Sequence, residues 1–131
     1  MVTDPIANML TSIRNAQAAR KPFVRVPYSR VKHALAEALR NAGYVGPVSK
    51  ATEGSRAFLE MMLLYDASGQ PRIRGLERVS KPGRRWYVRQ REIPRVLSGL
   101  GVAVLSTSRG LLTDAEARKR GLGGEVICTV W

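Results

Sequence analysis

Three hydroxyl side chains, a guanidinium and a glycine follow one another as Ser106-Thr107-Ser108-Arg109-Gly110. Serine and threonine hydroxyls both donate and accept hydrogen bonds, so they can read a base edge or a ribose 2′-hydroxyl. Arg109 can anchor a phosphate, and Gly110 lets another chain approach the backbone closely. Because serine and threonine are also ordinary turn residues, the stretch is either a plain turn or a nucleic-acid-binding bend.

The charge of the chain indicates an anionic partner. Lys and Arg number 22 against 10 Asp and Glu, which gives a formal net charge of +12. Such a surplus concerns partners rather than fold, and nucleic acid and anionic membrane are the candidates. Most of the basic residues are arginine, whose planar fork suits phosphate and stacks on bases. A membrane fits less well, because no long helical pattern sets a cationic face opposite Trp or Phe.

Basic residues gather between residues 72 and 95, where only Glu77 and Glu92 are acidic. In strand geometry Arg72, Arg74 and Arg78 would share one face. A charge run of this kind is either a solvated strand face or a phosphate-binding surface. The basic members are Arg72, Arg74, Arg78, Lys81, Arg84, Arg85, Arg89, Arg91 and Arg95.

Tyr87 lies inside this basic stretch. Strand alternation places it on the same face as Arg85 and Arg89, whereas Trp86 and Val88 point the other way. A flat ring between guanidinium groups suits RNA backbone and exposed bases. The alternative is a partly buried core ring on a solvated face.

Several kinds of site are excluded by composition. Cys128 is the only cysteine and His33 the only histidine, so an internal disulfide is impossible and an ordinary zinc site is essentially excluded. Cys128 lies in an apolar run and is expected to be buried, and His33 lies in a helical pattern. No paired carboxylates and no phosphate-binding loop motif occur. We therefore expect no enzyme, no metal and no cofactor.

The first half of the chain predicts a small α/β unit over residues 1–65. Thr3 or Asp4 can cap a helix that has Pro5 in its first turn, followed by a strand over residues 23–27. A second helix begins after Ser29 and ends at Gly43. Residues 44–50 and 56–65 form a hairpin around a loop at 51–55, and residues 66–71 are the linker candidate. The inward positions of the two helices are Ile6, Met9, Leu10 and Ile13, then Val31, Leu35, Ala38 and Leu39.

The second half, residues 66–131, predicts a mainly β unit. Residues 72–80 and 84–90 are interpreted as strands around the turn at 81–83, and residues 92–101 as a short helical turn. Two strands flank the hydroxyl bend, and Thr113 and Glu116 form a capping box for a short helix. Gly123 and Gly124 indicate either a tight entry to the last strand or a bare backbone that admits a nucleotide beside Glu125. The fold class is therefore α+β with two small subdomains.

Three stretches resemble a known family when they are taken in order. They are DPIANMLTSIRN at 4–15, RVSKPGRRWYV at 78–88 and GLGVAVLSTSRGLLTDAEARKRGLGGEVIC at 99–128. Together they resemble the bacterial type of the small-subunit ribosomal protein eight family, over nearly the whole chain. The resemblance implies a primary rRNA-binding protein that binds an irregular helix in the central domain of 16S rRNA and helps to assemble the platform of the small subunit.

The resemblance also implies which residues bind RNA. Ser106, Thr107 and Ser108 should contact bases and sugars, with Gly124 and Glu125 beside them, and Tyr87 should stack or pack on the same RNA. Lys81, Arg84, Arg85 and Arg109 supply charge. The N-terminal helix should meet a second RNA segment through Thr3, Asp4, Asn8, Arg14 and Asn15.

Partners and location follow from the same resemblance. Small-subunit protein five is the expected neighbour, and the free protein is expected to be a monomer. The resemblance also implies that the protein represses translation of its own operon by binding the operon's mRNA. The chain shows neither a secretion signal nor a membrane span, so we expect it in the cytoplasm. A general RNA chaperone or a DNA-binding protein would carry similar charge, whereas an enzyme acting on RNA would need an acid–base pair that is not evident.

Overall fold

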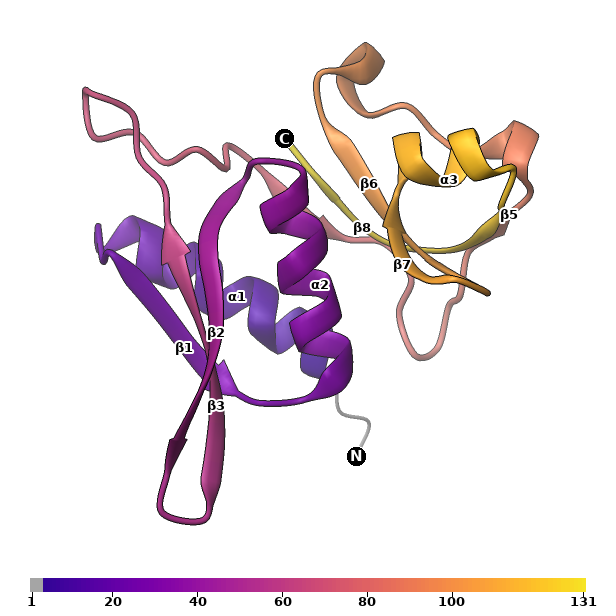
Figure 1. Ribbon diagram of the computed structural model, residues 1–131. Coiled ribbons are helices and arrows are strands. Elements are labelled where there is room, and N and C mark those ends of the chain that lie inside the picture. Colours follow the sequence, from indigo (N-terminus) through magenta and orange to yellow (C-terminus); the bar gives the residue numbers. More distant parts are fainter. Residues whose placement is uncertain (1–3) are drawn as a thin grey trace. The chain divides into compact units, whose positions relative to one another are not determined.

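A computed structural model describes residues 4–131 and shows the expected mixed α+β architecture, with helices and two antiparallel sheets (Figure 1). Residue contacts divide the chain into two compact units. The N-terminal unit comprises residues 5–73, and the C-terminal unit comprises Asp4 and residues 74–131. The expected division of the chain into subdomains at residues 1–65 and 66–131 remains a prediction.

Helix α1 (Pro5–Ala18) begins with the proline that the sequence placed in its first turn. A proline tolerates this position because the first amide groups of a helix have no intrahelical acceptor. The expected apolar stripe is buried, which confirms the prediction for Ile6, Met9, Leu10 and Ile13.

Helix α2 (Arg30–Asn41) is capped by Ser29, whose hydroxyl accepts from the amide of Lys32 at 3.2 Å. Leu35, Ala38 and Leu39 are buried as predicted, but the prediction for Val31 is wrong because its side chain is exposed. Lys32 takes the inward place in the first turn. Lysine can cover apolar surface with its aliphatic stem. Helical spacing alone therefore could not predict which of Val31 and Lys32 is buried.

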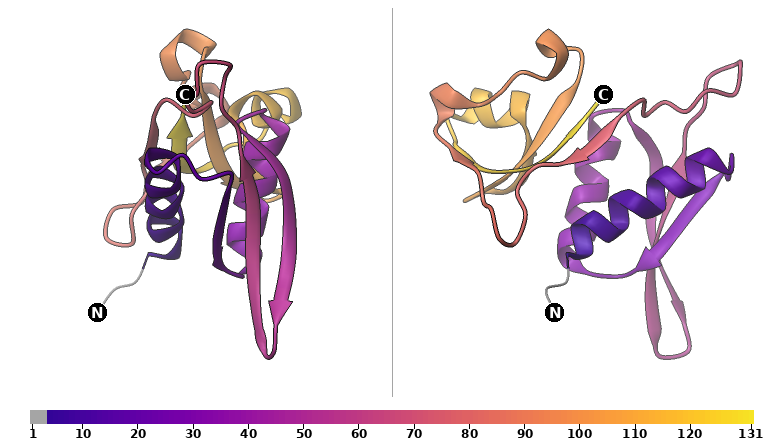
Figure 2. Two further views of the ribbon diagram at one scale, coloured as in Figure 1. Left: turned by 90° about the vertical axis from the view of Figure 1, so that its left-hand side faces the viewer. Right: turned by 180° about the vertical axis from the view of Figure 1, so that it is seen from behind.

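The N-terminal sheet has the strand order β1-β3-β2. The side chains of alternate residues in β1 and β3 are buried on one face of the sheet, and both helices pack on that face (Figure 2). Each edge strand contains a proline, Pro27 in β1 and Pro47 in β2. The bounds are β1 (Phe23–Pro27), β2 (Val45–Glu53) and β3 (Arg56–Leu63).

The β2–β3 hairpin is longer than the sequence predicted. Pairing continues to Glu53 opposite Arg56, so the loop expected at 51–55 is wrong and only Gly54 and Ser55 form the turn. Gly54 has a φ of 60°, a left-handed conformation that glycine adopts without steric cost. The distal part of the hairpin extends past the end of β1, which pairs no further than Pro27 opposite Phe58.

The C-terminal unit is built around β8, which pairs with β4 and β5 along one edge and with β6 along the other. The strands expected at 72–80 and 84–90 are therefore much shorter, and they pair with β8 instead of with each other. The bounds are β4 (Leu76–Arg78), β5 (Tyr87–Val88), β6 (Val102–Thr107), β7 (Gly110–Thr113), α3 (Asp114–Arg120) and β8 (Gly124–Val130), with 3₁₀ helices at Gln90–Glu92 and Val96–Gly99.

The short helix α3 confirms its predicted capping box. Thr113 and Glu116 bond to each other's backbone, and Gly121 ends the helix with a φ of 69°. Ala117 of α3 belongs to a buried cluster with Leu105, Leu112 and Val126. This cluster lies on one face of the C-terminal sheet, so the neighbouring strand residues project from the opposite face.

Cys128 is buried in β8, as the sequence predicted. Burial raises the pKa of its thiol from an ordinary 9.0 to about 12, because the charged thiolate is poorly solvated there. The folded protein therefore holds this proton more tightly than the unfolded chain does. Its contribution to stability is complete below about pH 9 and is lost as the pH rises toward about 12.

We expect the folded protein to resist alkylation of Cys128 by iodoacetamide at pH 8.5, since a protonated, buried thiol is a poor nucleophile. The same protein in 6 M guanidinium should react as a free cysteine. Mass spectrometry of the time course measures both rates. Comparable rates in the two conditions would show that the thiol is accessible in the folded state.

Candidate nucleic-acid interface

Three of the residues singled out in the sequence lie side by side across the C-terminal sheet. Glu125 of β8 is paired directly with Ser106 of β6 on one side and with Tyr87 of β5 on the other. Directly paired residues of antiparallel strands point to the same face, and this face is the one opposite the Leu105 and Val126 cluster. We call Ser106, Glu125 and Tyr87 the cross-strand row. Tyr87 is 68% exposed, whereas Glu125 is 8% exposed.

The hydroxyl bend connects β6 to β7 immediately beyond this row. Ser108 and Arg109 occupy the turn, and Gly110 follows with a φ of 96°. A left-handed glycine after a two-residue turn is the geometry of a glycine bulge, which glycine stabilises because it has no Cβ.

The three hydroxyls of the bend have different environments. Thr107 Oγ1 donates to the carbonyl of Gly110 at 2.8 Å and accepts from the amide of Arg109 at 3.1 Å, so this hydroxyl holds the turn together. Within the described residues, the hydroxyls of Ser106 and Ser108 have no hydrogen-bond partner. Two of the three hydroxyls are therefore available to a ligand.

Gly123 and Gly124 permit close contact between backbones. A Cβ on Gly124 would lie 2.1 Å from the carbonyl oxygen of Ser106, and one on Gly123 would lie 2.4 Å from that of Val88. The glycines thus make the tight entry to β8 that the sequence suggested. Because Gly124 has no Cβ, the backbone of Ser106 can lie close to it and next to Glu125. The space where a side chain would begin is filled by that backbone.

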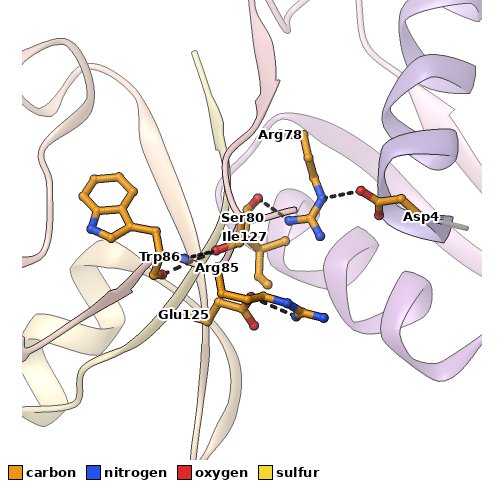
Figure 3. A network of polar contacts seen from close by, with 7 residues as sticks. All are labelled: Asp4, Arg78, Ser80, Arg85, Trp86, Glu125 and Ile127. Atoms are coloured by element: carbon orange, nitrogen blue, oxygen red, sulfur yellow. Dashed lines mark hydrogen bonds and ion pairs between the residues drawn. The ribbon is translucent and has the colours of Figure 1, made fainter. Parts of the chain in front are cut away.

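Glu125 is paired with one of the predicted cationic residues. Arg85 Nη1 donates to Glu125 Oε2 at 2.9 Å (Figure 3). This hydrogen bond, followed by the attraction between the charges, raises the pKa of Arg85. The pair links the cross-strand row to the basic loop that precedes β5.

Hydrogen bonds hold the two ends of that basic loop, residues 80–86, together. The hydroxyl of Ser80 accepts from the amide of Trp86 at 2.8 Å, and the carbonyl of Trp86 accepts from the amide of Val126 at 2.9 Å. Lys81 and Arg84 exchange two backbone hydrogen bonds of 2.9 Å across the turn. The loop is therefore a defined structure that presents its side chains outward.

Trp86 and Val88, which strand alternation places on the side away from Tyr87, differ in exposure. Val88 is buried in the sheet core, but Trp86 is 45% exposed. The reason is that Trp86 precedes the two-residue strand β5, beyond the area that the core covers. Trp86 is the residue of this surface that sequence reasoning missed, although its type and its place beside basic residues were visible.

The shared face expected for Arg72, Arg74 and Arg78 is also wrong. Strand β4 begins only at Leu76, and Arg72 belongs to the N-terminal unit, where its guanidinium lies 4.9 Å from the ring centroid of Tyr44. Arg78 donates to Asp4 Oδ2 at 3.1 Å and to the carbonyl of Ile127 at 2.8 Å (Figure 3). Its guanidinium is therefore engaged within the protein.

The remaining candidates lie at the N-terminal end of the chain. Asn8, Arg14 and Asn15 are on the exposed side of α1, whereas the carboxylate of Asp4 is paired with Arg78. Thr3 lies outside the described residues. Among residues 4–131, no group of acidic, histidine and cysteine side chains could hold a metal ion, and no helix is long and apolar enough to cross a bilayer.

Comparison with known proteins decides the family. The family model described as Ribosomal protein S8 matches residues 4–131. The chain belongs to the ribosomal protein S8 family. It is 52% identical over 130 residues to the small ribosomal subunit protein uS8 of Moorella thermoacetica, which covers 99% of this chain and 100% of that protein.

Further S8 relatives match at similar levels. The uS8 protein of Caldanaerobacter subterraneus subsp. tengcongensis is 51% identical over 131 residues, with 100% of this chain and 99% of the relative covered. That of Dictyoglomus turgidum is 51% identical over 130 residues, covering 99% and 98%. Membership of the S8 family identifies a structural ribosomal protein, so the chain is not an enzyme.

Proposed function

We propose that this protein binds directly to the central domain of 16S rRNA through its C-terminal unit and helps to assemble the platform of the small subunit. The coarser role follows from the family, since its members are structural components of the small subunit of the cytoplasmic ribosome. The observation that carries the finer proposal is the cross-strand row, which brings Ser106, Glu125 and Tyr87 together beside the hydroxyl bend.

The chemistry of this surface suits an irregular RNA helix. Such helices display unpaired bases and 2′-hydroxyls, which sequence-specific RNA-binding proteins use. The hydroxyls of Ser106 and Ser108 can bond to sugars and base edges at close range, and Tyr87 offers an exposed ring for stacking. Lys81, Arg84 and Arg109 would attract the phosphates. We therefore assign affinity mainly to the basic residues and site choice to the bend.

A footprint on protein-free small-subunit rRNA at physiological salt tests the proposal. We expect a localised region of protection within the central domain. The same complex should survive an excess of transfer RNA and double-stranded DNA, which separates it from a general RNA chaperone or a DNA-binding protein. Absence of a localised footprint, or its loss to either competitor, would contradict the proposal.

The exposed face of α1 is proposed to contact a second rRNA segment through Asn8, Arg14 and Asn15. Small-subunit protein five is the proposed protein neighbour. The mRNA of the protein's own operon is proposed as a second target of the same bend. Repression of that mRNA in a cell-free translation reaction should be relieved by the rRNA central domain, because both RNAs would compete for one surface.

We expect Arg84→Ala to flatten the salt dependence of rRNA binding. One fewer phosphate contact releases fewer counterions, so the slope of log K against log salt should fall by about 0.7–0.9. Filter binding across a potassium chloride series measures the slope. Arg56→Ala, an exposed arginine at the β2–β3 turn of the other unit, is the matched control. An unchanged slope for Arg84→Ala would remove Arg84 from the phosphate-binding residues.

A further inference from the structure

Trp86 is unusual because its backbone is fixed while its ring stays largely exposed. Both backbone polar atoms are bonded, the amide to Ser80 and the carbonyl to Val126, and Ser80 itself is fully buried. A ring on such a loop loses little conformational entropy when a ligand covers it. Large exposed aromatic surface on a rigid support is typical of binding sites.

Trp86 is one of the residues that line a hollow of about 450 Å³, and most of the others are cationic. Arg78 and Arg85 are neutralised by Asp4 and Glu125. Among the described residues, Lys81 and Arg84 have no acidic partner, so their charges are free to act on a ligand. The hollow is lined by Arg78, Val79, Lys81, Arg84, Arg85 and Trp86.

We propose that Trp86 stacks on an unpaired base of the bound RNA while Lys81 and Arg84 hold the phosphates of the same nucleotide. This inference rests on the proposed RNA-binding function and names a contact beyond the hydroxyl bend. An aromatic ring beside unpaired cations matches the two parts of a single-stranded nucleotide, its flat base and its charged backbone. A base paired inside a regular helix could not present its face to the ring.

The nucleotide at Trp86 is a different one from that at the cross-strand row. Trp86 and Tyr87 are adjacent in the chain, so their rings leave opposite sides of this edge of the sheet. Figure 3 shows the indole pointing away from Glu125 and Arg85. The row and Trp86 thus bind separate nucleotides.

Tryptophan fluorescence and affinity test the proposal together. A single-stranded RNA pentanucleotide should quench the emission of the wild-type protein, and a blunt RNA duplex should not. Trp86→Phe, which leaves Trp131 as the only tryptophan, should show no quenching by either RNA. For an rRNA central-domain fragment, we expect Trp86→Ala to weaken binding about tenfold and Trp86→Phe to restore most of the affinity.

Phe23→Ala is the matched control, because Phe23 is an aromatic ring of similar exposure, 49%, on the other unit. It should change affinity less than about twofold, well below the effect of losing a stacked base. If the wild-type footprint is present but Trp86→Ala binds like Phe23→Ala, the stacking inference is overturned and the proposed function stands. If the wild type gives no footprint, the proposed function itself fails. Should Trp86→Ala unfold, the wild-type quenching alone decides, and its absence overturns the inference.

Discussion

Replacing Gly124 with alanine is expected to lower the free energy of unfolding by about 3 kcal/mol, near the upper end of overpacking effects. The new Cβ would lie 2.1 Å from the carbonyl oxygen of Ser106 and 2.9 Å from its carbonyl carbon. Both are backbone atoms of a paired strand and cannot rotate away. Strands β6 and β8 would have to separate at the cross-strand row, so localised rRNA binding should fall with stability. Urea unfolding followed by circular dichroism measures the change.

Gly83→Ala is the control for the same chemical change. Gly83 lies in the turn of the basic loop, has nothing within 4 Å of an added Cβ and does not adopt a positive φ. We expect its effect to be within about 0.5 kcal/mol, as for exposed positions without special features. A Gly124→Ala protein as stable as Gly83→Ala would mean that β6 and β8 are not held as closely as the structure has them.

Ser108→Ala is expected to weaken binding to cognate rRNA by about 1–3 kcal/mol, the cost of leaving a desolvated polar group of the partner unpaired. Binding to random duplex RNA should barely change, because phosphate contacts supply that affinity without reading sequence. Ser108 is suited to this test because its hydroxyl has no partner among the described residues, so its removal leaves the turn intact. Gel-shift titrations on the two RNAs compare the affinities.

Ser55→Ala makes the same change in an exposed turn of the N-terminal unit, and it should leave both affinities unaltered. Equal losses on cognate and random RNA for Ser108→Ala would refute the division between affinity and site choice. Thr107 is the less informative position, since its hydroxyl bonds to Gly110 and Arg109 and its loss would disturb the bend itself.

Features decided by neighbouring residues could be predicted from the sequence. Pro5 at the start of α1, the Thr113–Glu116 capping box and Gly121 at the end of α3 each depend on contacts within one turn of a helix. The hydroxyl bend was recognisable for the same reason, because Gly110 marks a turn between two apolar runs.

Features decided by distant segments could not be predicted. Both 72–80 and 84–90 have the composition of strands. Their pairing partner, β8, and the small number of residues that pair depend on a segment far away in the sequence. The exposure of Trp86 follows from that short pairing. The cross-strand row likewise depends on the register of β8 against two other strands, and a shift of one residue would move Glu125 to the opposite face.

Gly124 shows how a site can depend on a residue that has no side chain of its own. The sequence favoured a tight strand entry over a backbone open to a nucleotide, and the carbonyl of Ser106 fills the space beside Gly124. A glycine in a strand indicates that another group comes close to the backbone, but not whether that group is a ligand or a neighbouring strand.

The prolines of the N-terminal sheet affect the protein before it reaches RNA. An edge strand with a continuous row of amide donors can recruit a strand from another molecule and begin aggregation. Pro27 in β1 carries no amide hydrogen, and in β2 Pro47 lies where the strand register shifts between Val45 and Val48, so neither edge is a regular strand along its whole length. A newly made chain with this much β structure is thereby protected from self-association during the interval between synthesis and assembly.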